Sequence, residues 1–494
     1  MNITPDLKQF KRLAKKHNLI ILSHKFYCDW LTPVSVYQGL RAGMPGESFL
    51  LESVEGREKI CRFSFLGFEP LCVFKTKAES VYIDDVCRRM GPGTHPLEEL
   101  KRLMTAFKPA PLEQLRFFGG FVGYLGYGLV RFWEPVGPRL ADDIKAFDAY
   151  LILPRYLVIF DHITRQVEIL LFVKTGAGGD RDALYKRQAA DLEKFCRLVR
   201  TVRGLPKLGF CPAPNTFHSN FPKKDFLAAV AQAREYIKAG ENIQVVVSQR
   251  FSRAFKADPF GVYRYLRLLN PSPYMFFLDF KGVQLAGSSP EMLVRCEDSE
   301  LVTHPIAGTR KRGKTEAEDE ALAKELLADT KERAEHLMLV DLARNDLGRV
   351  AASSSVNVPK FMAIEKFSHV MHIVSEVRAR LAKGKDMFDA FVSCFPAGTL
   401  SGAPKVRAMQ IINELEPAER GPYGGAVGYF SFTGDLDTCI TIRTVAFKNG
   451  KAYVQAGAGI VSDSVPSREY QETLNKAQAQ MLAVGYALGD KSRR

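Results

Sequence analysis

Short apolar runs, each broken after a few residues by glycine, proline or charge, constrain the fold of this chain most. Such runs in the first third of the sequence are Ser48–Ser53, Arg62–Phe68, Phe117–Tyr127 and Tyr150–Phe160. Their length and punctuation are typical of strands, and they predict a mixed α/β region. The longest candidate, Leu151–Phe160, contains Pro154 and Arg155, so it does not reach the roughly 18 apolar residues of a membrane helix. We expect no membrane-spanning segment.

Other stretches carry apolar residues at helical spacing and predict amphipathic helices. These are Ala183–Val202, Lys223–Lys238, Ala317–Leu327, Lys331–Leu342, Pro404–Glu414 and Arg468–Leu488. Further strands are predicted at Ile243–Phe251, Tyr274–Phe280, Tyr429–Phe432, Thr438–Phe447 and Lys451–Ala456. Leu205–Pro222 is rich in proline and has no period, so it predicts a linker. The chain then divides into an N-terminal region 1–204, a linker 205–222 and a second region 223–494.

Composition excludes several classes of protein. The nine cysteines form no Cys-x-x-Cys pair, so no zinc or dithiol motif is visible, and the N-terminus has no apolar secretion signal. We expect a reduced, cytoplasmic, soluble protein. The formal charge of +14 is spread along the 494 residues without a recognisable nucleic-acid-binding pattern. It therefore favours a basic surface or attraction of anionic metabolites over nucleic-acid binding.

Two Glu-x-x-Glu pairs are the first candidates for chemistry. Glu332 and Glu335 share one helical face, and Glu335 also shares it with apolar residues that should point inward. A buried carboxylate is costly unless it is paired or binds metal. Glu469 and Glu472 form the second pair, and four convergent carboxylates would suit Mg²⁺ rather than zinc. The alternatives are acids favoured by a helix dipole for the first pair and a surface ion pair with Lys476 for the second.

Several other segments hold polar groups among glycine and apolar residues. Gly457-Ala458-Gly459 ends a strand just before the helix with the second acidic pair and could offer backbone N–H groups to an anion, although such a sequence is more often a turn. Arg443 lies inside the apolar run Thr438–Phe447 and must pair, extend to water or bind an anion. Glu291 has apolar neighbours, and His369 and His372 are three residues apart. Each of these alone is more often a turn, a cap or a satisfied core group.

Taken in order, the segments form a larger pattern. They read NIQVVVSQR, NPSPYMFFLDF, GSSPEMLVR, PIAGTRKRG, HLMLVDLARNDLGRV, HVMHIVS, FPAGTLSGAPK, GPYGGAVGYF, LDTCITIRT, QAGAGIV and EYQETLNKAQ, with SFLLES, RFSFLG and FGGFVGYLGY in the N-terminal region. This series resembles the chorismate-utilising enzymes, and within them the large subunits of anthranilate synthase. The resemblance implies an α/β (α+β) fold of two large, mainly antiparallel sheets packed face to face, with helices outside and both regions intertwined.

The resemblance also implies roles for individual residues. Glu335 and Glu472 would bind Mg²⁺, with Glu332 and Glu469 acting through water. The ring carboxylate of chorismate would meet Mg²⁺, the backbone at Gly457, Ala458 and Gly459, and Lys476, and its enolpyruvyl carboxylate would meet Arg443 and Tyr423. Glu291 would be the general acid for loss of the C4 hydroxyl. His372, preferred over His369 and with Thr399 nearby, would assist the later proton removal.

Three features distinguish activities within the family, namely two single positions and the segment Leu50–Ser53, which is described below. Common aminodeoxychorismate synthases carry a lysine nucleophile in Pro-Ile-Lys-Gly-Thr, where this chain has Ala307, followed by Gly308 and Thr309 in the same substrate-lining turn. Isochorismate and salicylate synthases carry a lysine base where this chain has Gln244, which cannot deprotonate water. These positions favour formation of anthranilate and pyruvate, the first step of tryptophan biosynthesis, with aminodeoxychorismate synthase as the alternative.

Regulation and partners follow from the same resemblance. A tryptophan feedback site is implied at Leu51, Glu52, Ser53, Asn270, Pro271, Ser272, Pro273, Tyr274 and Met275, in a regulatory region that would cover 1–204. The chain has no Gly-x-Cys-x-Gly glutaminase motif. Ammonia would therefore come from a glutamine amidotransferase subunit or from solution. The remaining expected ligands are chorismate, Mg²⁺ and L-tryptophan, and no nucleic acid or membrane partner is expected.

Overall fold

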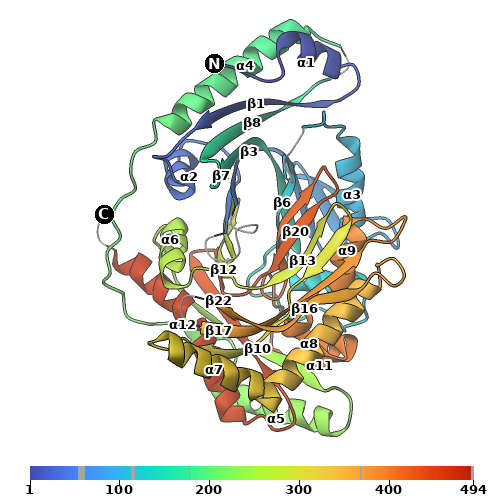
Figure 1. The fold of residues 1–494 in the computed structure, drawn as a ribbon, viewed down its shortest axis with the longest axis vertical. Helices are drawn as coiled ribbons and strands as arrows, with labels where there is room; N and C mark the ends of the chain where they lie inside the picture. The colour runs from blue at the N-terminus through green and yellow to red at the C-terminus, as the bar shows by residue number, and fades with distance from the viewer. Residues whose placement is uncertain (54–61, 113–116, 177, 368–369, 491–494) are drawn as a thin grey trace.

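The computed structural model describes residues 1–53, 62–112, 117–176, 178–367 and 370–490 (Figure 1). The helices are α1 Leu7–Leu13, α2 Pro33–Arg41, α3 Pro96–Ala106, α4 Arg181–Arg200, α5 Lys223–Lys238, α6 Pro259–Leu269, α7 Glu316–Ala328, α8 Thr330–Gly348, α9 Met387–Cys394, α10 Gly398–Ser401, α11 Lys405–Leu415 and α12 Pro466–Gly489, with a 3-10 helix at Tyr127–Phe132. The strands are β1 Leu19–Tyr27, β2 Ser48–Glu52, β3 Phe63–Lys77, β4 Ser80–Ile83, β5 Val86–Arg89, β6 Gly120–Leu125, β7 Ala149–Asp161, β8 Gln166–Lys174, β9 His218–Ser219, β10 Gln244–Ala254, β11 Tyr274–Phe280, β12 Val283–Ser289, β13 Met292–Glu297, β14 Glu300–Thr303, β15 Ile306–Lys311, β16 Asn357–Lys366, β17 Val370–Arg380, β18 Gly402–Ala403, β19 Ala426–Ser431, β20 Leu436–Ile440, β21 Thr444–Lys448 and β22 Lys451–Ile460.

The strands form two antiparallel series that share β7. One series runs β1-β8-β7-β3-β2-β11-β12-β21-β22-β10. The other runs β7-β6-β19-β20-β13-β14-β17-β15. Because β2 pairs with β11 and β6 with β19, strands of the N-terminal region are neighbours of strands from 223–494. The expected intertwined fold is therefore confirmed.

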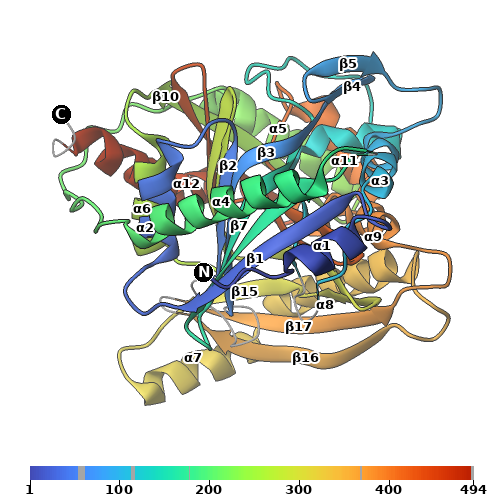
Figure 2. The same ribbon diagram turned by 90° about the horizontal axis from the view of Figure 1, so that it is seen from above.

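Three apolar clusters define the layers. The core between the two series contains Phe49, Phe276 and Leu285 from one side and Tyr124 and Tyr429 from the other. A second cluster places α2, α4, α6 and α12 on the outer face of the first series, and a third places α3, α8 and α9 on the outer face of the second. Figures 1 and 2 show α1 and α4 at one end of the molecule, with α5, α7, α8, α11 and α12 gathered toward the other. The predicted sheets with outer helices are confirmed.

The run Thr438–Phe447 is a correction to the sequence analysis, because it is two strands rather than one. β20 ends at Ile440 and pairs with β13 and β19 in the second series, whereas β21 begins at Thr444 and pairs with β12 and β22 in the first. The chain must turn to pass from one sheet to the other, and Arg443 takes a left-handed conformation there with φ of +50°. Arg443 therefore lies at the seam between the sheets and not inside a strand.

The predicted linker overlaps a stretch without helix or strand at residues 202–217. Its last part differs from the expectation, because His218–Ser219 forms β9 against β10. The functional division at this stretch stays a prediction. Among the described residues, no helix is both long and apolar enough to cross a membrane.

Candidate active site

A cavity of about 1610 Å³ opens where α8 and α12 face the strands β10, β22, β15 and β17. Most of the predicted catalytic, substrate and metal residues line it, namely Gln244, Glu291, Ala307, Thr309, Glu332, Glu335, His372, Thr399, Tyr423, Arg443, Gly457, Gly459, Glu469, Glu472 and Lys476. Two do not. Ala458 is fully buried in the core beneath β22, and Gly308 lies behind the wall at a bulge of β15. Residues far apart in the sequence are thus gathered around one space.

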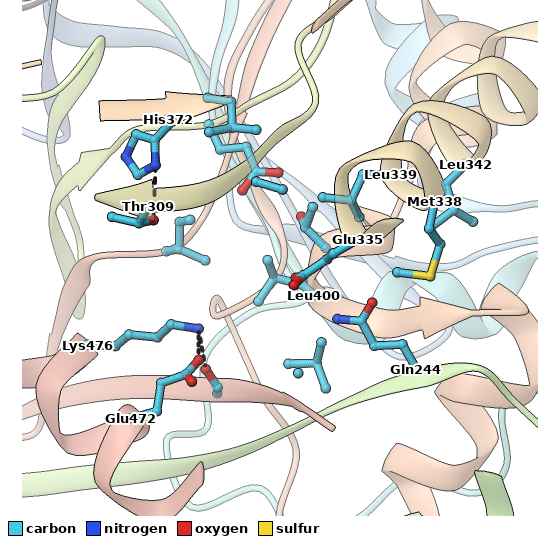
Figure 3. Close-up of a pocket in the computed structure, with 18 of the residues that line it drawn as sticks. Gln244, Thr309, Glu335, Met338, Leu339, Leu342, His372, Leu400, Glu472 and Lys476 are labelled. Atoms are coloured by element: carbon cyan, nitrogen blue, oxygen red, sulfur yellow. Dashed lines mark hydrogen bonds and ion pairs between the residues drawn. The ribbon is translucent and has the colours of Figure 1, made fainter. Parts of the chain in front are cut away.

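The acidic pairs come from opposite walls of this cavity (Figure 3). Glu335 projects from α8 and Glu472 from α12, where Lys476 pairs with Glu472 at 2.7 Å. Burial raises the pKa of Glu335, and repulsion by Glu332 and Glu472 raises it further. Burial also raises the pKa of Glu469, with a contribution from Glu472. The carboxylates therefore repel one another across the cavity, and this repulsion makes their ionised forms costly without a cation.

Their chemistry fits a hard divalent ion. Carboxylate oxygens are the ligands that Mg²⁺ prefers, and mutual repulsion among carboxylates is the penalty that such an ion removes. Among the described residues, no three His, Cys, Asp or Glu side chains are already gathered into a ready-made metal cage. Glu472 instead contacts Lys476, and Glu332 lies 3.5 Å from Arg310. The donor set fits magnesium, and the predicted direct ligands Glu335 and Glu472 stay a prediction.

Glu291 follows the end of β12 and points into the cavity from the seam between the sheets. Burial raises the pKa of its carboxyl to about 7, while Thr399 and Lys476 lower it slightly. The Thr399 hydroxyl approaches Glu291 without a well-formed hydrogen bond and has no other partner among the described residues. A carboxyl with this pKa keeps a proton near neutral pH and can donate it, which suits a general acid.

His372 on β17 lies on the other side of the cavity, held by the facing strand β15. A bulge at Gly308, whose φ is +67°, brings its carbonyl 2.8 Å from His372 Nδ1, and the Thr309 hydroxyl is 3.1 Å from the same nitrogen. Burial lowers the pKa of His372, and the positive charge of Arg443 lowers it further. With Nδ1 donating to Gly308, the neutral ring leaves Nε2 as an acceptor. His369 lies outside the described residues.

Gly457 and Gly459 present the backbone of β22 to the cavity. In an antiparallel pair, every second residue of a strand forms backbone hydrogen bonds with the neighbouring strand. The Gly450 carbonyl accepts from the Phe255 N–H, and the pairing of β22 with β10 continues without a bulge, so the even-numbered residues of β22 bond to β10. Gly457 and Gly459 therefore turn their peptide groups to the opposite edge, where β21 has ended. Lys476 Nζ donates to the Gly457 carbonyl at 3.1 Å.

Both positions leave little room for a side chain. A Cβ on Gly457 would lie 3.0 Å from the Tyr423 hydroxyl, and one on Gly459 would lie 2.5 Å from Gln244 Nε2. The sequence analysis treated the segment as the end of a strand at a helix start. The structure corrects this, since all three residues lie within β22 and α12 begins at Pro466.

Arg443 supplies a nearly buried positive charge. Its Nη1 donates to the Lys476 carbonyl at 2.5 Å, and its pKa is lowered because burial removes water from the guanidinium. Tyr423 is partly buried beside it. Desolvation raises the pKa of its hydroxyl, which therefore stays protonated. A desolvated cation beside a hydroxyl donor is a site prepared for an anion.

The residues predicted for the effector site are brought together by the pairing of β2 with β11. Met275 is opposite Glu52, and Leu51 is opposite Phe276. Glu52 is buried, with a raised pKa caused by desolvation, and it accepts a hydrogen bond from Tyr263 on α6. Ser53 follows directly after β2.

The second effector segment also borders the main cavity. Its residues Asn270, Pro271, Ser272 and Pro273 line that cavity, while Tyr274 donates to Asp437 at 3.0 Å. The predicted effector segments are therefore neighbours of one another and of the predicted substrate site.

Sequence reasoning missed a buried network behind Tyr423. Arg420 pairs with Glu416 at 2.6 Å, and both side chains are almost fully buried. Arg420 also donates to the carbonyls of Leu400 and Val246 at 2.7 and 2.8 Å. The only sequence signal was the i,i+4 spacing of the two charges, which is usually a surface pair.

The fold and the cavity define a class: enzymes built on two intertwined antiparallel sheets, with a carboxylate-rich and cation-bearing cavity at one side. A family model described as chorismate binding enzyme matches residues 46–482, and the chain belongs to that family. It is 45% identical over 502 residues to anthranilate synthase component 1 of Aquifex aeolicus, covering 99% of each chain. It is 41% identical to anthranilate synthase component 1 of Bacillus subtilis, covering 99% of this chain and 96% of the other.

Solved structures agree with the fold. Anthranilate synthase component I from Streptococcus pneumoniae superposes with a TM-score of 0.76 at 38% identity, covering 87% of this chain and 93% of that one. The menaquinone-specific isochorismate synthase of Escherichia coli gives a TM-score of 0.73 at 19% identity over 97% and 98% of the chains. The second likeness shows the shared fold.

Glu291→Gln tests the raised pKa directly. In wild type, the pKa of Glu291 moves from its ordinary 4.5 to about 7 on folding. Its contribution to the free energy of unfolding is therefore fully present below pH 4.5, and about 3 kcal/mol of it is lost as the pH rises through 7. The amide cannot ionise, so we expect the variant to gain thermal stability relative to wild type between pH 5 and pH 8. Melting curves across this range measure the difference. Parallel pH profiles would contradict it, and Glu320→Gln on the exposed face of α7 serves as the control.

Proposed function

We propose that this chain is the large subunit of an anthranilate synthase, converting chorismate and ammonia to anthranilate and pyruvate. The observation that carries the proposal is the full-length similarity to anthranilate synthase component 1, at 45% identity in the Aquifex aeolicus relative. The cavity supports it by offering a protonated acid, a neutral histidine and two cations. A cytoplasmic location stays a prediction from the sequence.

Chorismate is a dianion, and the cavity offers two places for its carboxylates. Arg443 and Tyr423 form the desolvated cation and donor that would hold the enolpyruvyl carboxylate. The ring carboxylate would meet the open edge of β22 at Gly457 and Gly459, with Lys476 beside it. An anion at this edge would draw Lys476 from Glu472 and free that carboxylate. Substrate binding and metal binding would then favour each other.

The bound magnesium ion would supply a positive charge that holds and polarises the ring carboxylate. Glu335 and Glu472 would hold it directly, and Glu332 and Glu469 through water. Of these four cavity residues, Glu335 and Glu469 carry raised pKa values that a nearby cation would lower.

Proton transfers are assigned to Glu291 and His372. As the C4–O bond of chorismate breaks, Glu291 gives its proton to the leaving hydroxyl, which departs as water. The ammonia nitrogen forms a bond to C2 and loses one proton to solvent or to the ionised Glu291. His372 then removes the remaining C2 proton while the C3–O bond breaks, and the departing enolpyruvate is protonated to pyruvate. The ring is left aromatic.

Two neutral positions favour this reaction over its relatives. Gln244 offers no base for activating water, and Ala307 offers no nucleophile to the ring, although both line the cavity. Ammonia is then the remaining nucleophile. We propose that a glutamine amidotransferase subunit supplies it, and that L-tryptophan inhibits by binding at Leu51–Ser53 and Asn270–Met275. The contacts of these segments with each other and with the cavity support the effector proposal.

A direct assay tests the function. Purified chain is mixed with chorismate, MgCl₂ and ammonium chloride at alkaline pH, and anthranilate is followed by its fluorescence. We expect anthranilate and pyruvate in equal amounts, with loss of activity on adding EDTA and recovery on adding excess magnesium. Aminodeoxychorismate or isochorismate as the product would overturn the proposal.

Glu335→Ala tests the metal assignment. Loss of one direct ligand should lower magnesium-dependent turnover at least a hundredfold and raise the magnesium concentration needed for half activity. Magnesium binding by titration calorimetry gives a readout independent of turnover, and it should weaken in step. Glu320→Ala, an exposed acid on the neighbouring helix α7, should leave both unchanged. Wild-type magnesium affinity in Glu335→Ala would remove this residue from the ligand set.

Ser53→Phe tests the effector assignment. Ser53 directly follows Glu52, which is opposite Met275 in the β2–β11 pair, so a ring at this position would occupy space next to the predicted effector segments. The tryptophan concentration for half inhibition should rise at least tenfold, with kcat changed less than twofold. Inhibition curves at fixed chorismate measure this. Ser353→Phe, at an exposed position remote in the chain, is the matched control. If tryptophan inhibits Ser53→Phe as it does wild type, Ser53 is not part of the effector site.

A further inference from the structure

The N-terminal part of α8, which carries Glu332 and Glu335, is buried at a single side chain. Within residues 330–338, all of which the structure describes, His336 is the only buried residue, and its side chain is fully buried. Successive residues of a helix point about 100° apart. Glu335 therefore faces the cavity while its neighbour His336 points toward the sheet beneath α8, where β16 and β17 lie beside the helix (Figure 2).

Other contacts of this part of α8 are made near water. Lys331 lies 3.2 Å from Asp463, and both side chains are about two-thirds exposed. Arg310 lies 3.5 Å from Glu332, and these two side chains are partly exposed. Water and salt weaken such pairs. The buried contact of His336 is therefore the one that can hold the helix firmly beside the predicted metal ligands.

That buried contact is a hydrogen bond to Ser375 on β17. His336 Nε2 lies 2.6 Å from the Ser375 hydroxyl. The hydroxyl also accepts from the Met362 N–H at 2.9 Å, so its single hydrogen is left to donate to His336. Met362 lies at a register shift of β16 with φ of +48°, a conformation that a methionine keeps only where its surroundings hold it. The Ser375 hydroxyl thus joins α8, β16 and β17.

Ser375 is also connected to the strands that carry cavity residues. Its N–H donates to the Pro305 carbonyl at 3.1 Å, directly before β15, which carries Thr309. His372 lies on the same strand as Ser375, three residues earlier. The bond between His336 and Ser375 therefore sets the helix of the carboxylates against the two strands that hold the catalytic histidine.

We propose that His336 is a positioning residue for the predicted magnesium ligand Glu335, acting through its hydrogen bond to Ser375, an inference that rests on the proposed function. A ligand that a buried outer partner already holds in place needs no reordering when the ion binds. Loss of such a partner typically weakens metal binding about 10- to 100-fold. Without this bond, the N-terminal part of α8 would depend on its exposed ion pairs, and Glu335 would lose its fixed position.

Ser375→Ala and His336→Leu each remove the hydrogen bond from one side. We expect the Kd for magnesium, measured by titration calorimetry, to rise about tenfold in each variant. At saturating magnesium, kcat should stay within about threefold of wild type, because Glu291 and His372 lie on other elements. Thermal melting shows whether each variant folds. If His336→Leu does not fold, Ser375→Ala, which loses only one hydroxyl, is the deciding variant.

Two further variants separate positioning from general stability. In His336→Gln, the amide oxygen can accept from Ser375 as Nε2 does, so the Kd for magnesium should stay within about threefold of wild type. Ser393→Ala is the matched control, since this buried serine on α9 donates to the Ala390 carbonyl of its own helix at 2.9 Å. Its loss should lower the melting temperature without changing the Kd for magnesium.

Wild-type magnesium affinity in folded Ser375→Ala means that the bond is purely structural, and it overturns the proposal. Equal weakening in His336→Gln and His336→Leu also overturns it, because the hydrogen bond would then not be the cause. Both results leave the proposed function intact, since wild type would still form anthranilate with magnesium. A wild-type chain that binds no magnesium would instead remove the metal assignment and this inference together.

Discussion

The buried ion pair between Arg420 and Glu416 is the interaction on which the rest of the site depends. Removing one partner of such a pair leaves an uncompensated charge, which costs about 3–5 kcal/mol. Here the pair also joins distant segments, because Arg420 donates to Leu400 and Val246 while Glu416 accepts from the backbone and hydroxyl of Ser248. It fixes α10 against β10. The ring centroid of Tyr423 lies 5.6 Å from the guanidinium, so this pair also fixes the cavity wall that carries Tyr423.

The passage of the chain between the two sheets explains where the cavity forms. β20 and β21 follow each other closely but belong to different series, and the crossing leaves the edge of β22 beyond Val454 without a partner from β21. That edge holds Gly457 and Gly459, and the crossing residue is Arg443. One topological constraint thus places an open row of peptide groups beside a desolvated cation. Neither feature would arise if Thr438–Phe447 were one continuous strand.

The sequence predicted the individual helices and strands well, but it predicted poorly which of them contact one another in the fold. Strands such as Tyr274–Phe280 and helices such as Arg468–Leu488 follow from local apolar periods, which the structure confirms to within a few residues. The approach of Glu335 to Glu472 depends on contacts between residues more than a hundred positions apart, which no local period encodes. Only the ordered motifs of a known family pointed to it. Arg420 and Glu416 were missed because i,i+4 charges are usually exposed, and burial is a property of the fold.

The acids of the cavity need different protonation states, and the fold supplies them through different neighbours. Glu291 lies against apolar β13 and α8 with few charges near it, so desolvation dominates and its pKa reaches about 7. Glu335 and Glu469 also have raised pKa values, but part of that rise comes from other carboxylates and would be reversed by a divalent cation. Cation binding would thus ionise the metal ligands while leaving Glu291 protonated. The different causes of the raised pKa values thus allow both roles in one cavity.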